Sequence, residues 1–234
     1  MQYETEDGVK VEVRTTADGS STLYVPALDE HYHSTHGALQ EAQHVYLGAG
    51  LEPRLTTAKT RVRVLEIGFG TGLNALLTLQ RSLSANAGID YDTLEKSPLP
   101  PAVIRSLGVE RYVLNPELRA YHEQLHGAAW DEPVGLTAGF TLRKMHGSLQ
   151  DTTLPANQYD VVYFDAFAPE KQPDMWTDAV FTQLYEATAT GGVLVSYCAK
   201  GSFRRSLKAA GWLVEKIPGP PGKREMTRAR KPDY

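Results

Sequence analysis

The chain has 234 residues, of which 41% are hydrophobic, so it can bury a full core and one domain is the simplest expectation. No stretch approaches the roughly 20 apolar residues of a transmembrane helix, and the first ten residues lack the apolar run of a signal peptide. The single cysteine, Cys198, excludes an internal disulfide and favours a reducing compartment. We therefore expect a cytoplasmic protein without a membrane partner.

Charge is spread unevenly along the chain. The net charge of −4 is not typical of a nucleic-acid-binding protein, but residues 199–231 contain ten Lys or Arg and only two Glu. This segment therefore carries about +8. It is either a phosphate-attracting surface or a solvated segment that keeps the protein soluble.

The N-terminal part predicts a β-hairpin, because alternating residues at 9–14 and 21–25 flank a turn signal, Ala17-Asp18-Gly19. A polar, histidine-rich stretch over 29–36 and a short helix over 38–47 are expected to follow. We expect residues 1–60 to form this hairpin and a cap segment. Residues 61–234 are expected to form the main domain, within one structural unit overall.

From residue 62 onward, strand patterns alternate with helix patterns. Pro98 is expected to open a helix that runs to Leu107, and Ser202 to cap a helix that Gly211 stops. The predicted strands are 62–67, 89–94, 140–145, 159–164 and 193–197, and the predicted helices are 73–83, 98–107, 178–188 and 202–210. We also expect a helical insertion over 111–133 and a terminal hairpin formed by 212–217 and 226–229. This order predicts a Rossmann-like α/β fold, with a mostly parallel sheet covered by helices on both faces.

The clearest motif is Glu66-Ile67-Gly68-Phe69-Gly70-Thr71-Gly72, between the first predicted strand of the main domain and the helix after it. It is not the G-x-G-x-x-G dinucleotide fingerprint, and it lacks the Lys-Ser/Thr of a P-loop. The acid before the glycines suits a cationic ligand without phosphates, such as the amino-acid end of S-adenosylmethionine. Glu95, roughly 25 residues after the first glycine, suits two ribose hydroxyls. A purely structural glycine turn is the alternative.

Asp165 follows the strand predicted at 159–164, where open α/β sheets bind their ligands. It is either a cap of the following turn or the group that orients a nucleophilic nitrogen against a sulfonium methyl. An amine must be neutral to attack, and a nearby carboxylate favours its charged form. Asp165 would therefore act by orientation or by receiving the proton released after transfer.

Two segments carry a family resemblance: Leu65–Asn74 (LEIGFGTGLN) and Phe164–Trp176 (FDAFAPEKQPDMW). They resemble the signatures of the methyltransferase half of MnmC and of its stand-alone relative MnmD. Further matches are Tyr46-Leu47-Gly48, Glu95-Lys96 and Gly222-Lys223-Arg224-Glu225-Met226. The resemblance covers about residues 30–230 in the family's order.

The resemblance implies methylation of the 5-aminomethyl group of the tRNA wobble uridine, giving 5-methylaminomethyl-(2-thio)uridine, with S-adenosylmethionine as cofactor and the tRNA anticodon region as partner. The fused relatives also carry an FAD-dependent oxidase domain, for which this chain is too short, so it is expected to need the free aminomethyl group.

The resemblance also implies the site residues. Asp165 would be catalytic, and Lys223 and Arg224 would lie near the RNA backbone. Two further substrate contacts are expected from the residues themselves: Tyr32 as part of a cap, and Phe167 by stacking on a base. The cofactor site would comprise Glu66, Gly68, Gly70, Gly72, Asn74, Glu95, Lys96, Gly147, Ser148 and Asp165. Many relatives have Asp where this chain has Ser148, so either Ser148 or Asp151 would contact adenine.

Other patterns compete with this interpretation. His122-Glu123-Gln124-Leu125-His126 matches the H-E-x-x-H zinc-peptidase motif, but no third ligand follows at a known spacing, so no metal is expected. His31, His33 and His36 form a metal site, a mobile polar loop or a cap over the cofactor or the uridine. Met175 and Trp176 either stack on a base or pack in the core.

Two rival functions stay open. One is another amine methyltransferase or a polyamine-synthase-like aminopropyl transferase, and the other is a non-catalytic tRNA-binding protein with the same fold.

Overall fold

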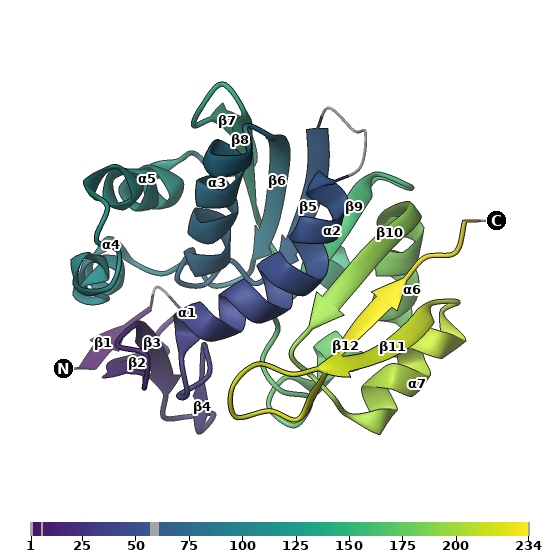
Figure 1. Cartoon of the computed structure of the whole chain (residues 1–234). Helices are drawn as coiled ribbons and strands as arrows, with labels where there is room; N and C mark the ends of the chain where they lie inside the picture. Colours follow the sequence, from purple (N-terminus) through teal and green to yellow (C-terminus); the bar gives the residue numbers. More distant parts are fainter. Residues whose placement is uncertain (1, 6, 57–60, 234) are drawn as a thin grey trace.

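The computed structural model describes residues 2–5, 7–56 and 61–233. At its centre lies an eight-stranded sheet with the order β11–β12–β10–β9–β5–β6–β8–β7 (Figure 1). Its strands are β5 (Arg61–Ile67), β6 (Gly88–Glu95), β7 (Pro133–Gly135), β8 (Phe140–His146), β9 (Tyr159–Phe164), β10 (Thr188–Ser196), β11 (Leu213–Pro218) and β12 (Glu225–Arg230). The pairs β5–β6, β6–β8, β5–β9 and β9–β10 are parallel, and the edge strands are antiparallel. The predicted mostly parallel α/β fold is confirmed.

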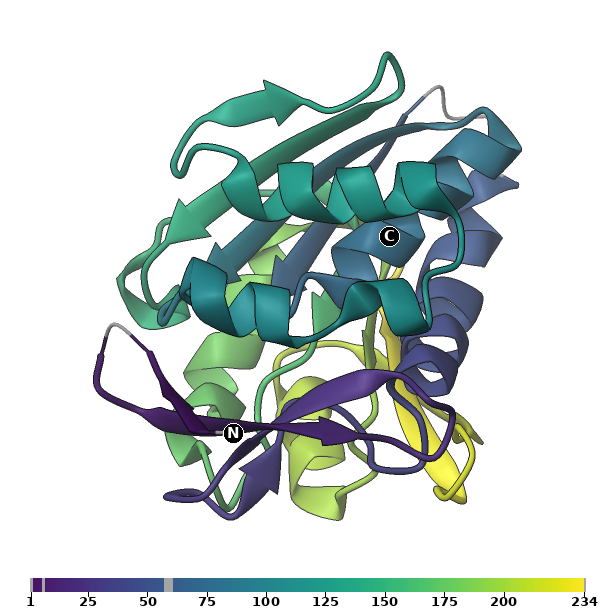
Figure 2. The same ribbon diagram turned by 90° about the vertical axis from the view of Figure 1, so that its left-hand side faces the viewer.

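Helices cover both faces of this sheet, as its strands' apolar runs predict. Alternate residues point to opposite faces, so Val64 and Tyr163 pack under one helical layer and Leu65 and Phe164 under the other. The first layer contains α3 and the long N-terminal helix, with α5 outside α3, and the second contains α6 and α7 (Figures 1 and 2). The helices are α3 (Leu73–Ala85), α4 (Pro101–Ser106), α5 (Pro116–Gly127), α6 (Asp178–Ala187) and α7 (Gly201–Ala209), with short 3₁₀ turns η2 (Val109–Arg111), η3 (Leu149–Asp151) and η4 (Pro173–Trp176).

A separate four-stranded antiparallel sheet precedes the main sheet and lies beyond the carboxyl ends of its parallel strands (Figures 1 and 2). The predicted hairpin is present as β2 (Lys10–Thr15) and β3 (Ser21–Val25), and β1 (Gln2–Glu4) and β4 (Glu30–His31) extend it on either side. Residues Val11, Leu23 and Val25 belong to the same buried cluster as Val64. The expected boundary between residues 60 and 61 falls at residues 57–60, outside the described part.

The predicted helix over 38–47 is longer than expected. It runs through α1 (Ala38–Glu41), a π-helix η1 (Ala42–Leu51) and α2 (Glu52–Leu55). Gly48, Gly50 and Pro53 weaken the helical pattern in the sequence. Packing outweighs this propensity, because a Cβ on Gly50 would lie 2.9 Å from Val195 Cγ2, so glycine lets η1 lie close against β10.

Three local predictions were wrong. Helix α4 begins at Pro101, not at Pro98. Ser202 does not cap α7, since the N-cap is Lys200 and Ser202 lies inside the helix. Strand β10 starts at Thr188 and passes through Gly191-Gly192 with a shift of register, whereas the sequence predicted a start after these glycines.

The terminal hairpin formed by β11 and β12 is confirmed, and the insertion contains α5 as expected. None of the helices in the described ranges is long and apolar enough to cross a membrane.

Candidate active site

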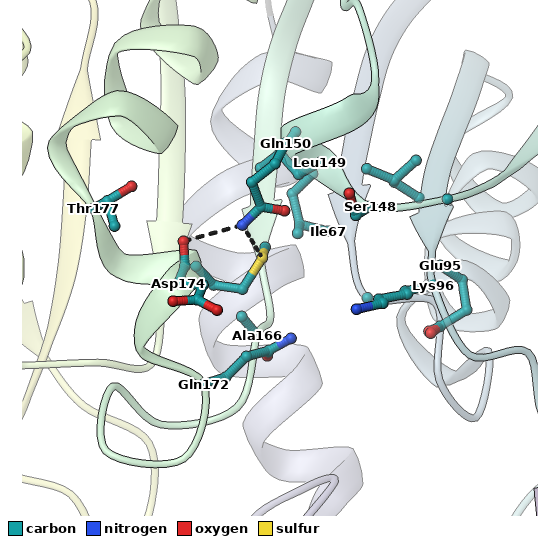
Figure 3. Close-up of a pocket in the computed structure, with 14 residues that line it drawn as sticks. Ile67, Glu95, Lys96, Ser148, Leu149, Gln150, Ala166, Gln172, Asp174 and Thr177 are labelled. Atoms are coloured by element: carbon teal, nitrogen blue, oxygen red, sulfur yellow. Dashed lines mark hydrogen bonds between the residues drawn. The ribbon is translucent and has the colours of Figure 1, made fainter. Parts of the chain in front are cut away.

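Two adjoining cavities open at the carboxyl ends of β5, β6, β8 and β9. The larger one, the strand-end cavity, has a volume of about 530 Å³ and lies between the β6 and β8 ends and the η4 turn (Figure 3). Gln150 closes one side of it, because its side-chain amide donates a hydrogen bond to the Asp174 carbonyl at 3.0 Å (Figure 3). The smaller one, the loop cavity, has a volume of about 140 Å³ and lies under the glycine loop. Gly68, Glu95 and Lys96 line both, so the two cavities form one continuous site.

The glycine loop borders this site through Gly68 and Gly70, whose φ angles are +93° and +49°. A Cβ on Gly68 would lie 3.0 Å from the Asp165 carbonyl oxygen, and one on Gly70 would lie 3.1 Å from Tyr32 Cδ1. Side chains at these positions would be strained and would press against Asp165 and Tyr32. The loop therefore requires glycine at both positions, and its backbone lines the loop cavity.

The carboxylate of Glu95 lies at the end of β6, where it holds the two loops around the site. Its oxygens accept hydrogen bonds from the backbone N–H of Gly70 at 3.0 Å and of Ser97 at 2.8 Å. Burial raises the pKa of Glu95, which means that it gains from further donors such as ribose hydroxyls. This is the position that the sequence predicts for the ribose acceptor.

Two predicted cofactor residues do not face these cavities. Glu66 is fully buried behind the loop, where it accepts a hydrogen bond from Thr93 at 2.9 Å, and burial raises its pKa to about 8. Gly72 has a φ of +72° at the start of α3 and lies against His126. Both residues support the glycine loop from the side that faces away from the cavities. The sequence motif alone does not distinguish this supporting role from direct contact with the cofactor.

Gly147 and Ser148 line the strand-end cavity, and Ser148 lies on the same side of it as Lys96 (Figure 3). The Ser148 hydroxyl donates to Asp151 at 2.6 Å, and Asp151 does not line the cavity. Of the two adenine acceptors that the sequence left open, only Ser148 therefore lies at the wall.

Asp165 lies at the end of β9, at the junction of the loop cavity with a third space, the cap cavity. Its two carboxylate oxygens accept hydrogen bonds from the Tyr46 hydroxyl at 2.5 Å and the Asn74 side-chain amide at 2.9 Å, which fix its orientation. Burial raises the pKa of Asp165 to about 7, and the hydrogen bond from Tyr46 opposes this shift. A carboxyl group with this pKa exchanges a proton readily near neutrality.

The cap cavity has a volume of about 290 Å³ and lies between the histidine-rich segment and the β11–β12 connection. Tyr32 and Phe167 form its wall toward the loop cavity, with their rings edge-on at 5.1 Å. Lys223 also lines it, where its ammonium group pairs with Glu41 at 2.8 Å and lies 4.0 Å from the centre of the Tyr197 ring. Three of the four predicted substrate residues thus meet around one space, whereas Arg224 is exposed on the connection outside it.

The segment that follows Asp165 is held by three side chains. The Trp176 indole donates to the Phe167 carbonyl at 2.8 Å, the Gln172 side chain accepts from the Phe167 N–H at 3.2 Å, and Tyr197 donates to the Ala166 carbonyl at 2.9 Å. Trp176 also packs on Phe164, so the packing alternative holds for this residue. Sequence reasoning missed the roles of Tyr46, Glu41 and Tyr197, although Tyr46 lies in a quoted family match.

The residues around the two adjoining cavities fit S-adenosylmethionine. Gly68 and Gly70 line the loop cavity, Glu95 is a carboxylate acceptor, and the side-chain oxygen Oδ1 of buried Asn74 lacks a hydrogen-bond partner among the described residues. Among the described residues that line these two cavities, Lys96 is the one lysine or arginine, so the walls suit a ligand without phosphates.

Comparison with known proteins agrees with this chemistry. Residues 133–232 match the family model described as S-adenosyl-L-methionine-dependent methyltransferase. The crystal structure of MNMC2 from Aquifex aeolicus superposes with a TM-score of 0.76 and 25% identity, covering 97% of this chain and 72% of that one. The chain thus resembles the S-adenosyl-L-methionine-dependent methyltransferases over its C-terminal part, and its fold resembles that of MNMC2. Its cofactor is S-adenosylmethionine.

The chain is also similar to longer proteins. It is 35% identical over 225 residues to the tRNA 5-methylaminomethyl-2-thiouridine biosynthesis bifunctional protein MnmC of Ralstonia nicotianae, covering 91% of this chain and 33% of that protein. The MnmC of Magnetococcus marinus is 33% identical, with 88% and 32% covered. The chain thus spans about a third of the length of these relatives. Spermidine synthase from Thermotoga maritima, at 12% identity and a TM-score of 0.58, shares the fold.

The basic segment is less exposed than its sequence predicts. Arg204, Arg228 and Arg230 pair with carboxylates at 2.6–2.8 Å, Lys200 pairs with Glu170, and Lys231 donates to backbone carbonyls. Four cations on α7, β11 and the β11–β12 connection are exposed and have no ion pair among the described residues: Arg205, Lys208, Lys216 and Arg224.

Proposed function

We propose that this methyltransferase methylates the 5-aminomethyl group of the wobble uridine in the tRNA anticodon region, giving 5-methylaminomethyl-(2-thio)uridine. The observation that carries the chemistry is the position of Asp165 between the loop cavity and the cap cavity. A carboxyl group at this junction faces the cofactor space on one side and a space open to an incoming amine on the other.

The tRNA part of the proposal rests on the relatives. Similarity to MnmC extends over about nine-tenths of the chain. The cap segment and the β11–β12 connection build the substrate side of the site. The exposed cations Arg205, Lys208, Lys216 and Arg224 supply positive charge for RNA phosphates.

In this mechanism the bound cofactor supplies an electrophilic methyl group on a sulfonium. Glu95 would hold the ribose, and the backbone of Gly68 and Gly70 would border the amino-acid end. Tyr32 and Phe167 lie between the cap cavity and the loop cavity, so the reacting group must pass beside them to reach the cofactor. They would therefore position the aminomethyluridine. The adenine side would be bounded by Gly147, Ser148 and Lys96.

Asp165 performs two steps for the amine. It accepts a hydrogen bond from the amine nitrogen and so directs the lone pair, and it takes the proton that the nitrogen loses. Its raised pKa of about 7 suits both, since the group is partly ionised at neutral pH and binds a proton without a large cost. Tyr46 and Asn74 keep the carboxylate in one orientation throughout.

The proposal is tested by incubating the purified protein with labelled S-adenosylmethionine and tRNA that carries 5-aminomethyluridine. We expect label in the wobble nucleoside, none in tRNA that lacks the aminomethyl group, and none in putrescine or spermidine. Methylation of the polyamines but not of tRNA would favour the rival small-amine function. Cofactor binding without transfer to either acceptor would favour the non-catalytic RNA-binding alternative.

A further inference from the structure

We propose that the H-E-x-x-H segment of α5 is a clasp for the cofactor loop, in which His122 and His126 act as positioning residues by holding the carbonyl group of Thr71. This inference goes beyond the proposed tRNA reaction, because it concerns cofactor binding alone.

The two histidines lie one turn apart on α5 and point the same way. The Nε2 atom of each lies 3.0 Å from the carbonyl oxygen of Thr71, so both ring N–H groups donate to the same acceptor. A carbonyl oxygen has two lone pairs and accommodates both donors. The two nitrogens converge as in a metal site, but a backbone oxygen stands where the ion would be.

The Thr71 carbonyl needs these donors. It lies between Gly70 and Gly72, whose left-handed φ angles turn the backbone away from a regular ladder. Among the described residues, its hydrogen-bond partners are the two imidazoles. Because Thr71 is 4% exposed, an unpaired carbonyl there would carry the cost of a buried unsatisfied acceptor.

Gly72 is shaped to admit the clasp. A Cβ at this position would lie 2.8 Å from His126 Nε2 and 3.2 Å from Phe69 Cζ. The third glycine of the motif therefore leaves room for an imidazole. The Thr71 side chain is also held, since its hydroxyl lies 2.7 Å from His33 Nε2 of the cap segment.

Helix α5 is itself fixed at both ends. Asn115 caps its first turn by accepting from the Glu117 N–H at 2.8 Å. Near its last turn, the ammonium group of Lys144 donates to the His126 carbonyl at 2.7 Å and lies 4.5 Å from the centre of the Trp130 ring. The clasp thus connects the cofactor loop to a pinned helix, so that the loop is positioned before the ligand arrives.

The surroundings keep both imidazoles neutral, and the Thr71 carbonyl requires a proton on each Nε2 atom. Burial lowers the pKa of His126 to about 3 and also lowers that of His122, so both rings are neutral at physiological pH. The charged groups facing them are Lys144, which lowers the pKa of His126, and Glu123, which raises that of His122. Glu123 is exposed and makes no hydrogen bond to the loop, so the acid of the motif is not part of the clasp.

The test measures S-adenosylmethionine binding by calorimetry, without tRNA, on proteins whose folding is checked by circular dichroism. His122→Ala/His126→Ala should weaken binding about 10- to 100-fold, because two donors to the loop are lost. His122→Gln/His126→Gln should stay within about threefold of the wild type, since the Gln amide reaches the same carbonyl. Glu123→Ala, on the same helix, is the matched control and should bind normally.

If the double alanine variant fails to fold, two single variants are compared instead: His126→Asn, whose amide is too short to reach Thr71, and His126→Gln, whose amide reaches it. A folded alanine or Asn variant with wild-type affinity would overturn the proposal. So would a folded Gln variant that binds as weakly as the alanine pair, because the donor would then be irrelevant. Long-range ¹H–¹⁵N spectra should show both rings as neutral Nε2–H tautomers, and Nδ1–H tautomers would equally contradict the clasp.

Discussion

At Asp165, burial and hydrogen bonding act on one carboxyl group in opposite directions. Burial raises its pKa to about 7, and the Tyr46 hydroxyl lowers it. Asp165→Ala should reduce turnover at least 100-fold while the affinity for S-adenosylmethionine stays within about tenfold, because orientation and proton acceptance matter in the transition state. Single-turnover kinetics and calorimetry measure the two effects, and the exposed Asp178→Ala is the control. An equal loss of cofactor affinity would make Asp165 a ligand-site residue only.

The pH dependence should follow the same carboxyl group. Asp165 accepts a proton only when ionised, so the rate should rise with pH through about 7 and fall below it. Tyr46→Phe removes a hydrogen bond to the ionised form and so raises the Asp165 pKa, which should move this limb to higher pH. Tyr163→Phe deletes a buried hydroxyl on the adjacent ring, whose described hydrogen-bond partner is Thr78. Tyr163→Phe should leave the pH at which the rate rises unchanged. An equal shift of this pH in both variants would show that the Tyr46 hydroxyl has no specific effect on Asp165.

Among the elements, the glycine loop has the strictest geometry. Gly70→Val should abolish S-adenosylmethionine binding, because φ is +49° and the Cβ would lie 3.1 Å from Tyr32. Glu95→Ala should weaken binding by about 1–3 kcal/mol, since the acceptor is lost. Gly135→Val is the matched control, because a Cβ there meets nothing within 4 Å. Calorimetry on folded variants decides, and normal binding in both site variants would mean that the cofactor lies elsewhere.

The elements themselves differ in how far sequence predicts them. The strand at 159–164 matches β9 at both ends, since its run is apolar except for Asp160 and is bounded by the polar residues Gln158 and Asp165. The helix through Ala42–Leu51 was underestimated, because Gly48 and Gly50 weaken its pattern and the close packing of Gly50 against β9 and β10 is visible only in the structure. Tertiary packing of this kind leaves no periodic signal.

The sequence predicts the candidate site in part as well, since it locates residues at strand ends but not contacts made by tertiary packing. Motif spacing located Gly68, Glu95 and Asp165, because strand ends converge by topology. It did not reveal that Tyr46 contacts Asp165, since 119 residues of chain separate the two. The sequence also predicted the same role for Lys223 and Arg224. In the structure Lys223 lines the cap cavity, whereas the next residue, Arg224, is exposed at the surface.

At the scale of the whole molecule, we expect Arg224 to contribute to RNA binding and its neighbour Lys223 to contribute to the methyl-transfer reaction. Arg224→Ala should weaken tRNA binding and reduce its salt-dependence slope by about one unit, because an exposed cation releases counterions. Lys223→Ala should instead lower turnover near neutral pH and leave the slope nearly unchanged, because Lys223 pairs with Glu41 and lowers the Asp165 pKa. Filter binding across a salt series distinguishes them. A smaller slope for Lys223→Ala than for Arg224→Ala would contradict this assignment.

The organisation of residues 1–60 as a hairpin and cap distinct from residues 61–234 stays a prediction. The shared cluster of Val11 and Leu23 with Val64 indicates that the two parts stabilise each other.

The central claim, methylation of a wobble aminomethyl group, is tested most directly in the organism that makes this protein. Nucleosides from its bulk tRNA are analysed by mass spectrometry after deletion of the gene and after complementation with wild-type or Asp165→Ala protein. We predict that 5-methylaminomethyl-(2-thio)uridine disappears, that 5-aminomethyl-(2-thio)uridine accumulates in its place, and that only the wild-type protein reverses the change. Unchanged levels of the methylated nucleoside in the deletion strain would contradict the account.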